Sequence, residues 1–171
     1  NETDENMLQI FSRFGIMLDD VQKNVKLLWH SIAGALFIQE KFGGTIILTG
    51  TNADYEFLEP LKTLPNVKSY IGKTTLEQNA AIIGACDLMI SGDSGPLHIA
   101  TALNIPSIGL YGSMPIKRTG TYGEKCIKSN MSCVPCNRRK CKYIKRTSQI
   151  YTPCMNEISI ASIINEIEKL L

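Results

Sequence analysis

A glycine-rich turn with one carboxylate, residues 91–98, is the part of the sequence whose residue types could do chemistry. It reads Ser-Gly-Asp-Ser-Gly-Pro-Leu-His and follows a short apolar run. Gly92 and Gly95 let a ligand approach the backbone closely, and Pro96 suits the first turn of a helix, where its missing N–H costs nothing. The pattern predicts a strand-to-helix turn that presents backbone amides, a place where phosphate groups bind.

Asp93 adds a second kind of chemistry to this turn. A carboxylate accepts hydrogen bonds from sugar hydroxyls while backbone amides hold phosphate, so the two together indicate a nucleotide sugar. Ser94 can cap the helix or bond an oxygen atom of a ligand. From the local spacing alone, an ordinary turn in which Asp93 and Ser94 cap the helix is an equally good interpretation.

The elements that must position the turn alternate along the chain. Helices are predicted at 32–42, 54–63, 75–85 and from the turn to Leu103, and short strands at 45–49, 67–70, 87–90 and 107–111. Apolar runs with little alternation are typical of a parallel sheet covered on both faces. We therefore expect an α/β fold with a Rossmann-like parallel sheet and helices on both faces, and the turn at the carboxyl ends of its strands.

The last third of the chain departs from this alternation. Residues 112–156 are rich in Gly, Pro, Cys and basic residues and show no further strand. A closing helix is predicted at 157–171, because apolar residues recur on one of its faces. These residues are Ile160, Ile163, Ile164, Ile167 and Leu171.

Composition sets limits on the class of protein. The chain has 18 Lys and Arg residues and 16 Asp and Glu residues. The resulting net charge of +2 does not by itself indicate a nucleic-acid or membrane partner. No apolar run of about 18 residues could span a bilayer, and the polar start at 1–6 is unlike a signal peptide. We expect a soluble, cytoplasmic chain, and the absence of an initial Met suggests a segment of a longer protein.

Residues 92–103, followed by Pro106 and by 110–112, closely resemble the donor-site signature of glycosyltransferase family 9, the ADP-heptose:lipopolysaccharide heptosyltransferases. The resemblance runs from about Ile32 to the end of the chain. It implies a GT-B enzyme with two Rossmann-like domains, of which this chain is similar to the C-terminal half. The implied organisation is a linker or incomplete N-terminal segment at 1–30 and a donor-binding domain at 31–171, with a Cys-rich basic loop at 126–154.

The resemblance also implies roles for particular residues. Asp93 would bond hydroxyls of the transferred sugar, and the amides of Ser94 and Gly95 would hold the diphosphate. The implied substrate-binding set is Lys26, Asp54, Thr74, Asp93, Ser94, Gly95, Pro96, Leu97 and His98. In it Thr74 meets the adenine, Asp54 the ribose and Lys26 the diphosphate, while His98 is expected to support the site by packing. The general base belongs to the other domain, so no catalytic residue is expected in this chain.

The implied reaction transfers a heptose from a nucleotide sugar, ADP-heptose, to a lipopolysaccharide core acceptor held by the absent N-terminal domain. The chain alone is expected to bind donor without transferring it, to need no cofactor, and to lie in the cytoplasm or at the inner membrane. Two alternatives stay open. One is a nucleotide-sugar epimerase of GT-B architecture, and the other is a non-catalytic zinc and nucleic-acid-binding module.

The cysteine pattern Cys133-x2-Cys136-x4-Cys141-x12-Cys154 is the feature that suggests zinc. Four thiols so close in sequence are typical of a tetrahedral structural site, although free thiols or disulfides remain alternatives. Basic residues with an interleaved Tyr143 surround Cys141, which indicates a solvated face or a contact with anionic lipid; no nucleic-acid partner is expected. These basic residues are Arg138, Arg139, Lys140, Lys142, Lys145 and Arg146.

Overall fold

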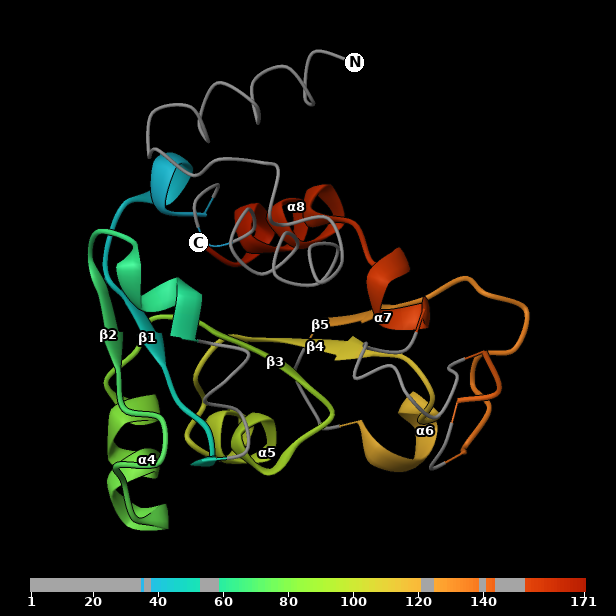
Figure 1. The fold of residues 1–171 in the computed structure, drawn as a ribbon, viewed down its shortest axis with the longest axis horizontal. Coiled ribbons are helices and arrows are strands. Elements are labelled where there is room, and N and C mark those ends of the chain that lie inside the picture. Colours follow the sequence, from blue (N-terminus) through green and yellow to red (C-terminus); the bar gives the residue numbers. More distant parts are fainter. Residues whose placement is uncertain (1–34, 36–37, 53–58, 121–124, 139–140, 144–152) are drawn as a thin grey trace.

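The computed structural model describes residues 35, 38–52, 59–120, 125–138, 141–143 and 153–171 (Figure 1). All strands described in these ranges pair in parallel. The first sheet joins β1 (Ile46–Leu48) to β2 (Val67–Ser69), with Leu48 opposite Ser69. The expected parallel α/β fold is therefore confirmed.

The second sheet has the order β3-β4-β5. Its strands are β3 (Met89–Gly92), β4 (Ser107–Tyr111) and β5 (Lys125–Lys128). Gly92 lies opposite Leu110, and Tyr111 lies opposite Lys128. The sequence pattern missed β5, because a strand at the sheet edge with Lys at both ends and an exposed Cys126 lacks the apolar run of a central strand.

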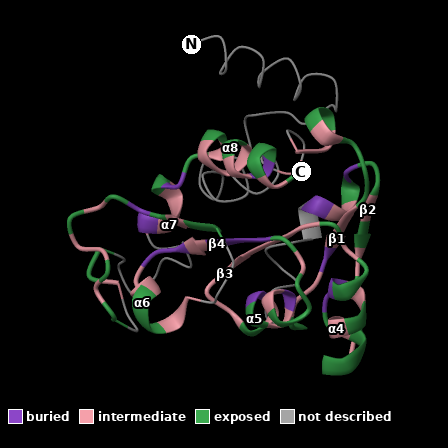
Figure 2. Cartoon of the chain, turned by 180° about the vertical axis from the view of Figure 1, so that it is seen from behind, coloured by how far each residue is buried: buried purple, intermediate pink, exposed green. Residues whose placement is uncertain are grey.

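Helices cover both faces of the β3-β4-β5 sheet. Helix α8 (Ile160–Leu170) lies on one side of it, and α4 (Leu76–Gly84) and α5 (Gly95–Ala102) lie on the other (Figure 1). The central strand β4 is almost entirely buried between these layers (Figure 2). The largest of the fully or almost fully buried side chains of this part are Ile83, Leu97, Ile108, Tyr111 and Ile167.

A second core cluster surrounds the β1-β2 sheet. It contains Leu48, Leu61, Leu64 and Ile71, with Ala35, Ile46 and Val67 packed against it. The helix predicted at 32–42 is helical at 38–42 and ends at Gly43, whose φ is 70° and whose N–H donates to the Gln39 carbonyl over 2.9 Å. An ion pair between Lys41 and Glu168 joins this helix to α8.

Two predicted helices differ from the structure. The described part of the helix predicted at 54–63 is a 3-10 helix, η3 (Glu59–Thr63). The closing helix predicted at 157–171 is α8, which begins at Ile160 and is capped by Ser159. A separate helix, α7 (Pro153–Glu157), precedes it in a segment for which no helix was predicted. Leu171 is 67% exposed, so it is not part of the buried face that Ile167 occupies. A short α6 (Ile116–Thr119) was not expected.

Candidate functional site

Asp93 and Ser94 form the turn between β3 and α5, at the carboxyl end of β3. Both residues are half-buried, whereas Gly95, the first residue of the helix, is exposed. The strand extends to Gly92, two residues beyond its predicted end. The polar groups of the turn therefore stand directly between the end of a strand and the start of a helix, the position where ligands bind in open α/β sheets.

Ser94 is the N-cap residue of α5, but its side chain makes no capping hydrogen bond to the helix. Its hydroxyl lies 2.8 Å from the hydroxyl of Ser91 and bonds to it instead. Pro96, the second helical residue, brings no N–H of its own. The Ser94 side chain therefore accepts no hydrogen bond from the amides of the first turn of α5. The interpretation of Ser94 as a side-chain cap is wrong.

The start of α4 provides the contrast. Thr75 caps it with a complete capping box, in which the Thr75 hydroxyl accepts from the Gln78 N–H over 3.2 Å and the Gln78 side chain accepts from the Thr75 N–H over 2.9 Å. The predicted cap at Thr75 is confirmed. Of these two helix starts, α4 is closed by its own side chains, whereas the N-cap side chain of α5 leaves the first-turn amides able to receive an external acceptor.

Leu97 and His98 follow the turn on α5 and differ from what the sequence indicated. Leu97 is fully buried, so its side chain belongs to the core and does not line the turn. His98 is exposed, so the interpretation of this histidine as a packed supporting residue is wrong. The reason is helical geometry: Leu97 and Ala100 take the core-facing side of α5, which leaves His98 between them on the outer side.

Thr74 lies between β2 and α4 and is half-buried. The preceding turn is in contact with the loop after β1, because a Cβ added at Gly72 would lie 1.8 Å from the Asn52 side-chain oxygen. Gly72 has a φ of 64°, and its N–H donates to the Gly50 carbonyl over 2.9 Å. The loops at the carboxyl ends of β1 and β2 are thus held together. Asp54 and Lys26 lie outside the described residues.

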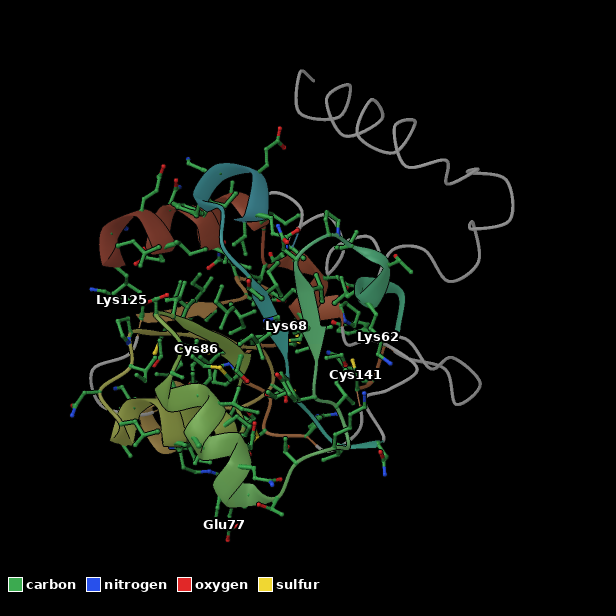
Figure 3. The ribbon with its side chains drawn as sticks, turned by 90° about the vertical axis from the view of Figure 1, so that its left-hand side faces the viewer. Lys62, Lys68, Glu77, Cys86, Lys125 and Cys141 are labelled. Carbon is green, nitrogen blue, oxygen red and sulfur yellow. The ribbon has the colours of Figure 1, made fainter. Side chains whose placement is uncertain are left out.

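Glu77 is an acidic residue that the sequence analysis did not single out. It lies in the first turn of α4, is exposed, and extends from the end of that helix into solvent (Figure 3). Its own backbone N–H and the Thr75 hydroxyl lower the pKa of its carboxyl from the ordinary value. An ionised carboxylate there can accept hydrogen bonds from ligand hydroxyls. The signal available in the sequence was an acid two residues after a capping threonine.

The four clustered cysteines line a common cavity of about 110 Å³. A neighbouring cavity of about 260 Å³ is lined by Cys133, Cys136 and Cys141 together with Arg138, Lys142 and Tyr143. Neither cavity is lined by the turn at Asp93. All six cysteines of the chain are thiols, with no disulfide among them. Within the described ranges, no three His, Cys, Asp or Glu side chains are gathered closely enough to hold a metal ion as they stand.

Parallel strands covered on both faces by helices, with an open helix start after β3, define a Rossmann-like α/β protein. The sequence profile of glycosyltransferase family 9 (heptosyltransferase) matches residues 21–146. The chain therefore belongs to glycosyltransferase family 9.

Relatives and solved structures agree with this assignment. Lipooligosaccharide heptosyltransferase 2 of Campylobacter jejuni is 31% identical over 109 residues, which cover 61% of this chain and 32% of that protein. The lipopolysaccharide core heptosyltransferase OpsX of Haemophilus influenzae is 35% identical over 106 residues, which cover 58% and 30%. The chain thus spans about a third of the length of these curated relatives.

Two solved structures share the fold. The E. coli ADP-heptose lps heptosyltransferase II matches with a TM-score of 0.62 and 22% identity, over 88% of this chain and 42% of that one. The family 9 glycosyl transferase from Veillonella parvula matches with a TM-score of 0.62 and 19% identity, over 99% and 51%. None of the described helices is long and apolar enough to cross a membrane.

Proposed function

We propose that this chain is the donor-binding part of a heptosyltransferase and holds ADP-heptose at the turn between β3 and α5. The observation that carries the proposal is the open start of α5, where Ser94 bonds Ser91 and leaves the first-turn amides to another acceptor. A diphosphate is an acceptor of this kind, because its charge is favoured by the helix dipole. The names of the family relatives support a heptose as the sugar.

Asp93 gives the turn its selectivity for a sugar nucleotide over a plain nucleotide. The carboxylate is half-buried at the start of α5, where it can accept hydrogen bonds from sugar hydroxyls while the amides of Ser94 and Gly95 hold the diphosphate. Glu77 and Thr74 follow β2, and we assign them to the nucleoside, together with Asp54 and, for the diphosphate, Lys26.

In the transfer we propose, an acceptor hydroxyl of the lipopolysaccharide core attacks the anomeric carbon of the heptose as its bond to the diphosphate breaks. The hydroxyl proton passes to a general base of the acceptor-binding half, and the negative charge that develops on the diphosphate is stabilised by the amides of α5. The residues described here would therefore bind the donor and assist departure of the leaving group.

Calorimetric titration of the whole chain with ADP, UDP, GDP and their sugars tests this proposal. We expect ADP-heptose to bind more tightly than ADP, and Asp93→Ala to lower the affinity for ADP-heptose by about 10- to 100-fold, since a hydrogen bond to a charged group contributes about 1.5–3 kcal/mol. The affinity for ADP should change little, because ADP lacks the sugar hydroxyls.

Asp87→Ala is the matched control, because this exposed aspartate precedes β3 and so lies at the opposite end of the strand. Equal losses in the two variants would contradict a role for Asp93 in sugar binding. Absence of any nucleotide binding, accompanied by tight binding of RNA, would refute the donor site as a whole.

We also propose that the protein works in the cytoplasm at the face of the inner membrane, with the basic loop toward anionic lipid. Arg138 and Lys142 are exposed members of this loop within the described residues. Sedimentation with anionic vesicles should weaken in an Arg138→Glu/Lys142→Glu variant and should not weaken in Lys68→Glu, a basic residue on β2. Unchanged sedimentation of the loop variant would contradict this contact.

A further inference from the structure

We propose that Cys133, Cys136, Cys141 and Cys154 bind one structural Zn²⁺, which fastens the loop at 129–143 to helix α7. This inference does not depend on donor binding. Three of the thiols belong to the loop and the fourth to the helix, yet all four line the same cavity of about 110 Å³. Four thiolates are a complete tetrahedral set for zinc.

The loop turns back on itself directly after its first pair of cysteines. Asn137, which follows Cys136, has a φ of 51°, in the left-handed region that reverses the chain direction. Its N–H donates to the Ser113 carbonyl over 2.7 Å, and the Val134 N–H donates to the Met131 carbonyl over 2.9 Å. The Cys-x-x-Cys pair is therefore held in a compact turn, as a zinc-binding pair requires.

Helix α7 is already attached to the start of this loop through Glu157. The Glu157 carboxylate accepts hydrogen bonds from the Ser129 hydroxyl and from the N–H groups of Asn130 and Met131, the latter two over 2.8 and 3.0 Å. Cys154 lies three residues before Glu157, so the two share a face of α7. The fourth thiol is thus presented on the helix face that already receives the loop.

The fourth thiol, that of Cys154, is buried against the end of the central strand. It is buried, and its Sγ lies so close to Gly112 that a Cβ added there would stand 2.9 Å from it. Gly112 directly follows β4, the central strand. A metal bound to this thiol would therefore tie the loop to the core of the domain.

The charges around the thiols favour their metal-bound form. Arg138 lines both cavities and Lys142 lines the larger one. Each thiol gives up a proton to solvent when it binds zinc, so the occupied site gains negative charge. Four thiolates and Zn²⁺ carry two net negative charges, which these two side chains offset.

The thiols surround the cavity without being gathered into a coordination shell, since no three potential ligands among the described residues are close enough to hold a metal as they stand. Such sites are commonly completed by the metal, because ligand assembly and metal binding are coupled. Zinc binding is therefore expected to contract the cavity and to draw the four thiols together.

Zinc content and thermal stability of the full chain, purified under reducing conditions, test the proposal. We expect about one Zn²⁺ per chain, and a Tm that falls when a chelator removes it. Cys133→Ser/Cys136→Ser should lose the metal and its chelator-dependent change in Tm. Cys86→Ser should keep both, because Cys86 is half-buried at the end of α4, far from Cys141 (Figure 3).

Cobalt substitution provides a readout that does not depend on stability. Co²⁺ in the wild-type site should give the absorption bands of a tetrahedral tetrathiolate centre, and Cys141→Ser should weaken the thiolate-to-metal band. Circular dichroism identifies any variant that fails to fold. A chain that contains no zinc and gains no Tm on its addition would overturn the proposal, as would zinc retained in Cys133→Ser/Cys136→Ser or disulfides among these cysteines in the native protein.

Discussion

The Ser129 hydroxyl donates a hydrogen bond to the Glu157 carboxylate, which joins the residue after β5 to the last residue of α7. The same carboxylate oxygen accepts from two successive backbone N–H groups, those of Asn130 and Met131. A single acidic side chain thereby fixes the entry to the cysteine loop. This arrangement makes the loop position dependent on a charge that can be titrated.

Glu157→Gln should lower stability at neutral pH and have less effect in acid. The Ser129 hydroxyl, followed by the N–H groups of Asn130 and Met131, lowers the pKa of the Glu157 carboxyl, which burial partly opposes. Its contribution is therefore present above the unfolded pKa of about 4.3 and is lost as the pH falls through the lower folded value. Urea unfolding of both proteins between pH 7 and acidic pH measures the difference.

Glu166→Gln is the control for this experiment, because Glu166 forms a partly exposed ion pair with Lys169, and both residues lie on α8. Exposed pairs contribute about 0–1 kcal/mol, so little change is expected. A destabilisation by Glu157→Gln that is the same at every pH would contradict a stabilising role for the ionised Glu157 carboxylate.

Thr75→Ala should destabilise the protein by about 1 kcal/mol, because it removes the capping box of α4. Ser94→Ala should cost less, since the Ser94 side chain bonds to Ser91 and does not cap α5. Urea unfolding of the two variants makes the comparison. If Ser94→Ala were the more damaging change, the description of α5 as an open helix start would be wrong.

Gly72→Ala should destabilise the protein by about 1–2 kcal/mol, because an alanine at a φ of 64° is strained and its Cβ would overlap the Asn52 side chain. The double variant Asn52→Ala/Gly72→Ala relieves the overlap and keeps the backbone strain, so it should recover part of the loss. Gly95→Ala, where an added Cβ meets nothing within 4 Å, should stay within about 0.5 kcal/mol. Equal stabilities of the Gly72 and Gly95 variants would contradict the prediction.

Ile167→Ala should cost about 2–5 kcal/mol, because this fully buried side chain of α8 packs in the core. Leu171→Ala, four residues later and 67% exposed, should change stability by less than about 0.5 kcal/mol. Thermal unfolding distinguishes the two. A large loss of stability in Leu171→Ala would show that Leu171 belongs to the buried apolar face, as the sequence predicted, and would contradict its exposed position.

Local patterns in the sequence were sufficient for most of the elements that carry the turn. The strand at 107–111 and the helix start at Thr75 were predicted correctly, because apolar runs and capping residues act within a few positions of the chain. The site residues Asp93 and Thr74 were placed on loops after strands for the same reason. Their roles toward a ligand remain predictions, as do those assigned to Asp54 and Lys26.

Tertiary structure alone decided how distant residues meet. The sequence of α5 shows a serine at its start, but only the conformation of the turn directs that hydroxyl to Ser91 and leaves the helix open. The spacing of the cysteines suggested zinc, yet only packing brings Cys154 of α7 to the cavity of the loop, through Glu157 and Ser129. Capping and apolar periodicity are local interactions that one segment determines, whereas these contacts depend on where the second sheet and its covering helices place separate segments.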